Sequence, residues 1–374
     1  MLKYLYVILL ASFLLISCSE SKSESQSEKT IKPITTDQEY FYAANYNLEN
    51  LFDTNDDVDK NDEWFTPTSE INWTEEKLEH KMVNLARVIK HMNNGNGPDI
   101  LGVEEVEHEE LLLTLTKKYI KNNNYEVAYS ESPDKRGIDN GLIYNRNLFD
   151  LIHLEPIKVI LEKNKLTRDI LFVKLISRKN NEVINVFVNH WPSRREGLKK
   201  SEKNRLAAAR VLKKATQSIL KVDPNSNIII LGDFNDLPSN ISINDVLNAK
   251  ELFCDRANNE DMYNLSYKLF QEGEGTYKFR DHWNMLDQII ISKGLLDRKN
   301  IDYVCQSFEI IKPEFVIQKS GKYKGTSMPT FGGRKYLGGY SDHFAVGASF
   351  SFKSKDSNDL GSRRIHKCLT NNKM

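Results

Sequence analysis

The sequence predicts an α/β fold in which β-sheets are covered by helices, within one domain from Tyr40 to Phe352. Short apolar runs alternate with amphipathic helical patterns along this segment, as expected of an α/β protein. Neither an internal repeat nor a linker interrupts them. A domain of about 310 residues is near the upper limit for a single hydrophobic core, so we expect two packed sheets.

Five short apolar runs predict strands. They are brief and rich in β-branched and aromatic residues, which favours strands over buried helices. The runs are Ile100–Val103, Ile184–Val188, Ile228–Leu231, Ile289–Ile291 and Phe344–Phe352.

Two segments predict helices. The first runs from Glu75 to Met92, because Thr74 is a suitable N-cap and Asn93-Asn94-Gly95 ends the pattern. Its buried face is predicted from helical spacing to contain Leu78, Met82, Leu85 and Ile89. The second helix covers about residues 200–220. There Leu206, Ala209 and Leu212 could face the core while the many lysines and arginines face water.

Charge and cysteine content exclude two classes of protein. Lysine plus arginine number 52, and aspartate plus glutamate also number 52, so the net charge is zero. A uniformly basic nucleic-acid-binding surface is therefore excluded, although a local basic patch is not. The 4 cysteines are too few and too scattered for a disulfide framework or a zinc cluster.

The N-terminal residues predict export and a lipid anchor. The apolar run Leu5–Ile16 follows Lys3 and is too short to span a bilayer, so residues 1–17 fit a signal peptide. The run ends in Leu15-Ile16-Ser17-Cys18, which resembles the lipobox of bacterial lipoproteins. This resemblance implies cleavage before Cys18, acylation of Cys18 and anchoring at the bacterial cell envelope. A signal peptide with an incidental cysteine is the alternative.

Polar segments flank the predicted domain. We expect residues 18–39 to contain the acylated cysteine and a flexible Ser/Glu/Lys-rich tether, and residues 353–374 to form a disordered polar tail. If Cys18 is acylated, three cysteines remain, and the sequence indicates no pairing among Cys254, Cys305 and Cys368.

Polar side chains stand at the ends of most predicted strands. Buried strands that end in carboxylates, amides and imidazoles hold polar sites on a rigid scaffold. Each residue alone could be a solvated strand end, an Asx turn or a structural histidine. The set includes Asn47, Glu49, Glu104, Glu105, His190, Asp233, Asn235, Asp287, Asp342 and His343.

Taken together, six segments resemble the endonuclease/exonuclease/phosphatase family, the superfamily of pancreatic deoxyribonuclease. They are YNLENLF (46–52), DILGVEEV (99–106), NHWPSR (189–194), GDFND (232–236), LDQ (286–288) and SDH (341–343). The family often has glutamine before its metal-binding glutamate, where this chain has Glu104. The resemblance gives the ligand role to Glu105, and the extra carboxylate could strengthen cation binding or face away.

The resemblance implies a four-layer α/β sandwich, with two packed mixed β-sheets flanked by helices, that hydrolyses a phosphate ester with an activated water. It implies a Mg²⁺ cofactor, with Mn²⁺ as a substitute, since hard cations prefer oxygen ligands. Glu105 is the first metal ligand, and the candidates for the others are Asn47, Glu49 and Asp342. The catalytic residues implied are His190, Asp233, Asn235, Asp287 and His343, with His343 paired to Asp287.

Three residues are candidates for substrate binding. Arg194 begins the basic run after His190, lies nearest the site within that run and suits a phosphate group. Arg334 and Tyr340, in the glycine-rich loop 321–340, suit phosphate contact and stacking, although the loop could be purely structural.

The acidic loop Asp53–Asn61 mimics the start of a calcium-binding loop. It has Val58 where an EF-hand needs glycine and Trp64 where it needs glutamate. An EF-hand is therefore not expected, and the loop is either a looser cation site or an acidic surface loop.

The expected function is that of a cell-surface nuclease that cleaves phosphodiester bonds. The alternatives are a phosphatase or phosphodiesterase for small phosphoesters or lipid headgroups, and a non-catalytic surface binding module. His190 stands where the abasic-site DNA repair branch has tyrosine, so DNA repair is not expected. The expected partner is nucleic acid or another phosphoester, with membrane contact only through the anchor and no protein partner.

Overall fold

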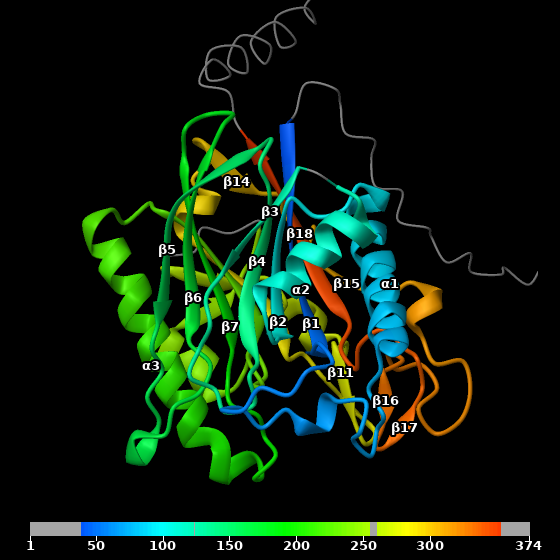
Figure 1. The fold of residues 1–374 in the computed structure, drawn as a ribbon. Helices are drawn as coiled ribbons and strands as arrows, with labels where there is room; N and C mark the ends of the chain where they lie inside the picture. The colour runs from blue at the N-terminus through cyan, green and yellow to red at the C-terminus, as the bar shows by residue number, and fades with distance from the viewer. Residues whose placement is uncertain (1–38, 123, 255–259, 353–374) are drawn as a thin grey trace, which may run out of the picture. The chain divides into compact units, whose positions relative to one another are not determined.

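The computed structural model describes residues 39–122, 124–254 and 260–352. The predicted signal peptide, Cys18, the tether up to residue 38 and the C-terminal tail lie outside the described residues. Two seven-stranded mixed sheets pack face to face with helices on their outer faces, which confirms the predicted α/β sandwich (Figure 1). No helix in the described ranges is both long and apolar enough to cross a membrane.

The first sheet has the strand order β14-β18-β1-β2-β4-β3, and β15 also pairs with β18. The pair β1–β2 is parallel and the other pairs are antiparallel. The strands are β1 (Glu39–Leu51), β2 (Ile100–Val106), β3 (Tyr125–Tyr129), β4 (Asp139–Asn145), β14 (Ile301–Tyr303), β15 (Glu309–Ile311) and β18 (Ala345–Phe352).

The second sheet has the strand order β5-β6-β7-β8-β13-β10-β9. The pairs β7–β8 and β9–β10 are parallel. The strands are β5 (Phe149–Ile157), β6 (Ile170–Ser177), β7 (Val183–His190), β8 (Asn227–Asp233), β9 (Ala249–Glu251), β10 (Met262–Asn264) and β13 (Asp287–Ser292). Two hairpins stand apart from both sheets: β11 (Tyr277–Phe279) with β12 (His282–Asn284), and β16 (Phe331–Gly332) with β17 (Lys335–Tyr336).

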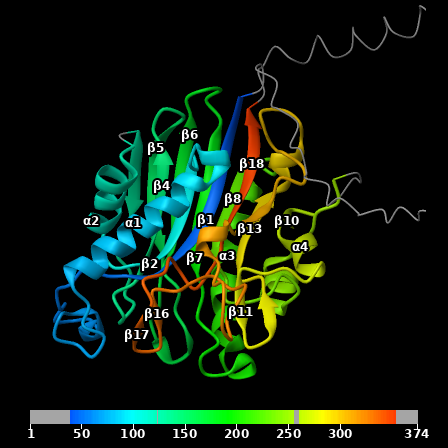
Figure 2. The same ribbon diagram turned by 90° about the vertical axis from the view of Figure 1, so that its right-hand side faces the viewer.

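Helices complete the outer layers. Figure 2 shows α1 in front of the sheets and α3 behind them. The α-helices are α1 (Glu75–His91), α2 (Glu109–Thr114), α3 (Leu198–Val222) and α4 (Tyr267–Gln271). Short 3-10 or π turns are η1 (Glu63–Phe65), η2 (Asn93–Gly95), η3 (Leu115–Ile120), η4 (Glu162–Asn164), η5 (Ser242–Leu247), η6 (Lys293–Leu296) and η7 (Glu314–Val316).

Successive side chains along a strand of the second sheet point to opposite faces, so this sheet contributes to two hydrophobic cores. In β8, Ile229 and Leu231 belong to the large core that also contains the first sheet. Ile228 and Ile230 point the other way and pack with residues of α3. This period of two explains why β8 reads as a continuous apolar run, because both of its faces are covered.

The two predicted helices are confirmed, with one correction. In α1 the Thr74 side chain accepts a hydrogen bond from the Lys77 N–H, and the four predicted apolar residues are buried. In α3, Ala209 and Leu212 are buried as predicted, but Leu206 is only half-buried. The buried position beside it holds Arg205, whose guanidinium pairs with Asp236 over 2.8 Å. A buried ion pair thus replaces the expected leucine contact.

The cysteine pairing also corrects the sequence prediction. Cys254 and Cys305 form a disulfide with their Cα atoms 6.1 Å apart, although they are 51 residues apart in the chain. The sequence carried no sign of this pair because only the fold brings the two segments together.

Candidate active site

Strand register aligns three predicted catalytic residues across the second sheet. His190 at the end of β7 lies opposite Asp233 at the end of β8. Asp233 in turn lies opposite Asp287 at the start of the antiparallel strand β13. All three side chains are buried. This catalytic row, His190–Asp233–Asp287, brings together segments that are far apart in the chain.

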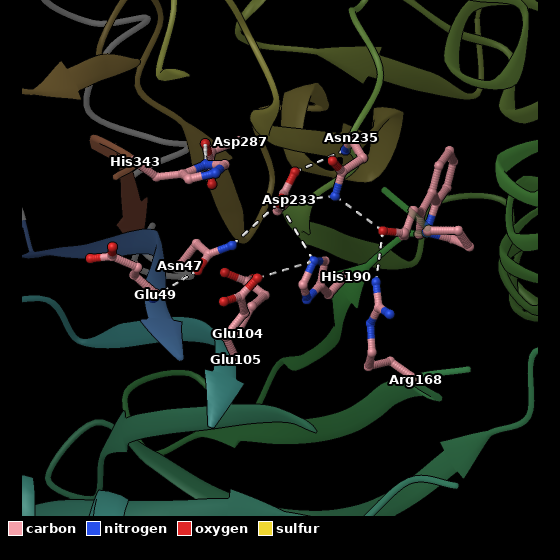
Figure 3. Close-up of polar contacts among 12 residues, drawn as sticks. Asn47, Glu49, Glu104, Glu105, Arg168, His190, Asp233, Asn235, Asp287 and His343 are labelled. Atoms are coloured by element: carbon pink, nitrogen blue, oxygen red, sulfur yellow. Dashed lines mark hydrogen bonds and ion pairs between the residues drawn. The ribbon is translucent and has the colours of Figure 1, made fainter. Parts of the chain in front are cut away.

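A second row crosses the first sheet. Asn47 in β1 lies opposite Glu104 in β2, and Glu104 lies opposite Asn140 in β4. The Asn47 amide Nδ2 donates to Asp233 Oδ2 over 3.3 Å and so links the two sheets (Figure 3). The candidate site therefore lies where the ends of the two sheets meet, and polar groups replace the apolar core there.

The turn after β8 fixes the Asp233 carboxylate. The Asn235 backbone N–H donates to Asp233 Oδ1 over 2.8 Å, and its side-chain Nδ2 donates to Oδ2 over 3.1 Å. Gly232, just before Asp233 in β8, has φ +155°, and a Cβ there would lie 2.1 Å from the Asn189 carbonyl oxygen, so this close approach of β7 and β8 requires glycine. Burial raises the pKa of Asp233 to about 7, against the opposing charge of His343.

His343 and Asp287 form the pair that the family resemblance implies. His343 Nδ1 lies 2.7 Å from Asp287 Oδ2, and the Tyr277 ring packs on the imidazole with 4.8 Å between ring centroids. Burial alone would lower the pKa of His343, but the charges of Asp287 and Asp342 raise it well above its ordinary value. Because Nδ1 is bonded to Asp287, the imidazolium can donate through Nε2.

The pKa of His190 is shifted in the opposite direction to that of His343. Its Nε2 lies 3.6 Å from Asp233 Oδ2 and 3.7 Å from Glu105 Oε1, while Nδ1 is buried without a hydrogen-bond partner among the described residues. Burial lowers the pKa of His190 well below its ordinary value, and the charges of Arg168 and Arg136 lower it further. The site therefore combines one neutral and one protonated imidazole.

A β-bulge separates the two glutamates at the end of β2. The pairing with β4 shifts register after Glu104, so Glu105 is the extra residue and has φ 62°. Glu104 Oε2 accepts from Asn45 over 3.2 Å, and burial raises the pKa of Glu104 well above its ordinary value. Glu104 is thus a fully buried group, whereas the bulge turns Glu105 towards the site.

The groups around Glu105 fit a Mg²⁺ ion. Glu105 Oε2 accepts from the Asn50 N–H over 2.9 Å, and the side chain remains 14% exposed. Burial raises the pKa of Asp342. The charge of His343 opposes this rise, and the charge of Glu105 adds to it. The Asn47 Oδ1 accepts from the Glu49 N–H over 2.9 Å. Carboxylate and amide oxygens are donors that Mg²⁺ accepts, one or two carboxylates at a time together with several waters. The metal-ligand roles of Glu105, Asn47 and Asp342 stay predictions.

Glu49 is tied to helix α1 and to the loop before β16. Its Oε2 accepts from the Thr330 N–H over 2.6 Å and lies 3.9 Å from Nζ of Lys81, which is fully buried. Lys81 Nζ also donates to Thr330 Oγ1 over 2.7 Å. Burial raises the pKa of Glu49 to about 7, against the charge of Lys81. The metal-ligand role of Glu49 stays a prediction.

Arg194 braces the catalytic turn in this structure. Its Nε donates to the Asn235 carbonyl over 2.5 Å, and Nη1 donates to Asn284 over 3.1 Å. Nη2 contacts Asp236 at 3.3 Å and Asn240 at 3.2 Å. Every guanidinium nitrogen therefore has an acceptor within the protein, and phosphate binding by Arg194 stays a prediction.

The two candidates of the glycine-rich loop lie in different environments. Tyr340 is buried, and its hydroxyl accepts from Arg87 over 3.0 Å, so its ring packs inside the protein and does not form a surface for a substrate. Arg334 is exposed, 2.9 Å from Glu70 and 5.9 Å from the centroid of the Trp64 ring. Arg334 thus remains the substrate candidate of this loop.

A cavity of about 640 Å³ opens beside the site. It joins the segment after β1 to the hairpin β16–β17, and aromatic and arginine side chains dominate its wall. The lining residues are Glu49, Asn50, Asn61, Trp64, Phe65, Trp73, Arg136, Arg195, Thr330, Phe331, Gly333 and Arg334. We call it the aromatic–arginine cavity.

Sequence reasoning missed three cations near the site. Arg136 donates to Asn50 Oδ1 and lies 4.0 Å from Glu105 Oε2, while Arg168 pairs with Asp134. Both arginines lie in loops, where the sequence shows neither a motif nor a helical or strand periodicity. Lys81 had a signal, since it lies on the predicted apolar face of α1.

Solved structures share this fold. The humanized D. rerio TDP2 with 14 mutations has a TM-score of 0.53 and 13% identity, with 83% of this chain and 98% of that chain covered. The human Nocturnin catalytic domain with bound sulfate has a TM-score of 0.50 and 17% identity, with coverages of 84% and 98%. A mannosyl-6-phosphatase of Bacteroides thetaiotaomicron has a TM-score of 0.52 and 14% identity, with coverages of 83% and 100%.

Identities this low show the fold alone, and no curated protein matches the sequence. The family assignment comes from the sequence itself. Residues 42–351, nearly the whole described part of the chain, match the model of one family of phosphoester hydrolases. The chain belongs to the Endonuclease/Exonuclease/phosphatase family.

Proposed function

We propose that this phosphoester hydrolase is a Mg²⁺-dependent nuclease that cleaves phosphodiester bonds at the cell surface. The observation that carries the proposal is the aromatic–arginine cavity, which is lined by Glu49 and Arg136 and which Arg136 connects to the candidate metal ligand Glu105. Arginine side chains bind phosphate oxygens and exposed aromatic rings stack on bases, which is the combination that single-stranded nucleic acid requires.

Three side chains are suited to bind the parts of a nucleic-acid chain that flank the scissile bond. Arg136 lies within 4.0 Å of Glu105, so it can contact a phosphate next to the one being cleaved. Trp64 is 41% exposed, and Arg334 packs over its ring. A substrate smaller than a nucleotide leaves most of this wall without a contact.

The residues of the site have distinct roles in the proposed hydrolysis. Glu105, Asn47 and Asp342 would hold Mg²⁺, whose charge would offset that of the phosphoryl oxygens. Asp233, with its pKa near 7, orients the attacking water and accepts its proton.

The two imidazoles act on the phosphoryl group. The protonated His343, held by Asp287, donates to a phosphoryl or leaving oxygen. Neutral His190 donates a hydrogen bond to the charge that develops on the phosphoryl group. The Asn235 side-chain amide donates to the Trp191 carbonyl and to Asp233, so its role is to orient the Asp233 carboxylate.

A substrate panel tests this proposal. The purified protein is assayed with Mg²⁺ against single-stranded DNA, double-stranded DNA, RNA, a nucleoside monophosphate, mannose 6-phosphate and a lipid-headgroup phosphodiester. We expect the highest kcat/KM on single-stranded nucleic acid. A higher kcat/KM on a phosphomonoester or a headgroup would contradict the nuclease and support the phosphatase or phosphodiesterase alternative.

We propose a lipid-anchored location at the bacterial cell envelope. The lipobox-like segment ending at Cys18 supports it, and so does the disulfide between Cys254 and Cys305, since disulfides persist in oxidising compartments outside the cytosol. Cys18→Ala should move the protein out of the membrane fraction or leave it unprocessed, as followed by fractionation and mass spectrometry. Processed protein that stays membrane-bound after this change would place the anchor elsewhere.

A further inference from the structure

The acidic loop after β1 folds back against the end of β2. Asp57 of the loop and Asp62, the residue directly after it, lie beside Glu107, and one carboxylate oxygen from each of the three lies within 4.8 Å of the others. An overlapping group joins Asp53, Glu107 and His108 within the same limit. Neither group belongs to the catalytic row, and the mechanism proposed above uses none of these residues.

We call the carboxylates of these two groups the acidic cluster: Asp53, Asp57, Asp62 and Glu107. Two of the four are buried. Asp62 is 0% exposed and Glu107 is 3% exposed. Within the described ranges, none of the four carboxylates forms an ion pair with a lysine or arginine, and the His108 imidazole lies 3.3 Å from Asp57. Buried carboxylates at this spacing repel one another unless a cation or protons neutralise them.

A second observation points to a missing ligand. Asp62 Oδ2 accepts from the Asp57 N–H over 2.9 Å, but Oδ1 is buried and has no hydrogen-bond partner among the described residues. Glu107 Oε2 accepts from the Asp53 N–H over 2.6 Å. A buried carboxylate oxygen without a donor, inside a group of other carboxylates, is the arrangement that a hard cation completes.

We propose that Asp57, Asp62 and Glu107 bind a structural Ca²⁺ ion. All three donors are oxygens, and Ca²⁺ accepts several carboxylates in irregular geometry, whereas Mg²⁺ demands a near-octahedral shell with few of them. The site differs from an EF-hand, because Glu107 comes from the end of β2 and not from the loop.

The ion connects the loop to the proposed substrate wall. Asn61 is the last residue of the loop, Trp64 and Phe65 follow it, and all three line the aromatic–arginine cavity. Fixing Asp57 and Asp62 against Glu107 fixes the start of that segment. The Ca²⁺ site thus holds the cavity wall without touching the reacting phosphate.

Calorimetric titration and thermal unfolding test the site. CaCl₂ is added to the purified protein in excess Mg²⁺, so that the catalytic site is already saturated and activity is not the readout. We expect one Ca²⁺ ion to bind and to raise Tm by about 5 °C at saturation. Asp62→Asn and Glu107→Gln should weaken binding at least tenfold and remove the Tm shift.

Two variants serve as controls. Asp59→Asn changes an exposed acidic residue of the same loop that lies outside the cluster and should bind Ca²⁺ as the wild type does. Glu105→Gln should also keep the Ca²⁺ response, which separates this site from the catalytic one. In EDTA, Asp62→Asn and Glu107→Gln should unfold at or above the wild-type Tm, because each removes a repelling charge.

Three results would overturn the Ca²⁺ site. They are a wild type that binds no Ca²⁺ at millimolar concentration, cluster variants that bind it like the wild type, and cluster variants that lose Tm in EDTA. The last result would mean that the carboxylates act as hydrogen-bond acceptors and not as cation ligands.

Discussion

At the residue scale, the site depends on buried groups that set one another's protonation. His343 is held protonated by the carboxylates around it, and the 2.7 Å contact with Asp287 fixes which ring nitrogen faces the site. His190, at the other end of the catalytic row, is held neutral by burial and by two arginines. One arrangement of strands thus produces two imidazoles with different roles.

Mutations of His343 and Asp287 test whether the two residues act as one catalytic unit. His343→Ala should lower kcat on the order of 10²–10⁴-fold, because the proton donor is lost. Asp287→Asn should have an effect of similar character, because the imidazole loses its partner. Since the two residues act as one unit, the double variant should be little worse than the worse single variant. Strictly multiplicative losses in kcat at saturating Mg²⁺ would mean that they work independently.

At the element scale, helix α1 and the hairpin β16–β17 hold the site from outside the sheets. Lys81 on α1 donates to Thr330, whose N–H in turn donates to Glu49. The cavity wall comes from η1 and this hairpin. Neither element supplies a residue of the catalytic row, but both position groups beside it.

Removing the Lys81 ammonium should destabilise the protein. Lys81→Met leaves Glu49, whose side chain is 11% exposed, without its cation, so we expect a loss of about 2–4 kcal/mol in the free energy of unfolding. Adding Glu49→Gln should recover part of the loss. Val83→Ala, on the exposed face of α1, is the control, and equal stabilities of Lys81→Met and Val83→Ala in urea unfolding would contradict the role of Lys81.

Trp64 on η1 tests the cavity as a substrate wall. Trp64→Ala should raise KM for single-stranded DNA about tenfold with little change in kcat, because a stacked base loses its aromatic surface. The same variant should hydrolyse a small phosphodiester dye as the wild type does. Tyr323→Ala, an exposed aromatic outside the cavity, is the matched control. An unchanged KM for DNA in Trp64→Ala would show that substrate does not contact this wall.

At the scale of the whole molecule, the sequence predicted what local patterns encode. The strand runs, the buried stripe of α1 and the polar strand ends were readable because alternation, helical spacing and capping are local. The structure then brings His190, Asp233, Asp287 and His343 together from four segments. Their joint position depends on sheet register, which no local pattern encodes, so only the family resemblance indicated that they share one site.

What the sequence could not predict depends on contacts between distant segments. Arg136 and the Cys254–Cys305 disulfide are examples, since neither lies in a local pattern. The burial of Tyr340 could not be predicted for the same reason. Its neighbours in the chain suggested an open loop, whereas the fold buries its ring beside Phe315, and its hydroxyl accepts from Arg87.

Metal dependence of phosphodiester hydrolysis tests the central claim most directly. The rate on single-stranded DNA is measured with Mg²⁺, after EDTA, and after excess Mg²⁺ or Mn²⁺ is restored, for the wild type and for Glu105→Gln. We expect EDTA to abolish hydrolysis, either ion to restore it, and Glu105→Gln to lose on the order of 10²-fold or more in kcat/KM even at saturating Mg²⁺. Full activity in EDTA, or wild-type activity in Glu105→Gln, would contradict a site built around a cation at Glu105.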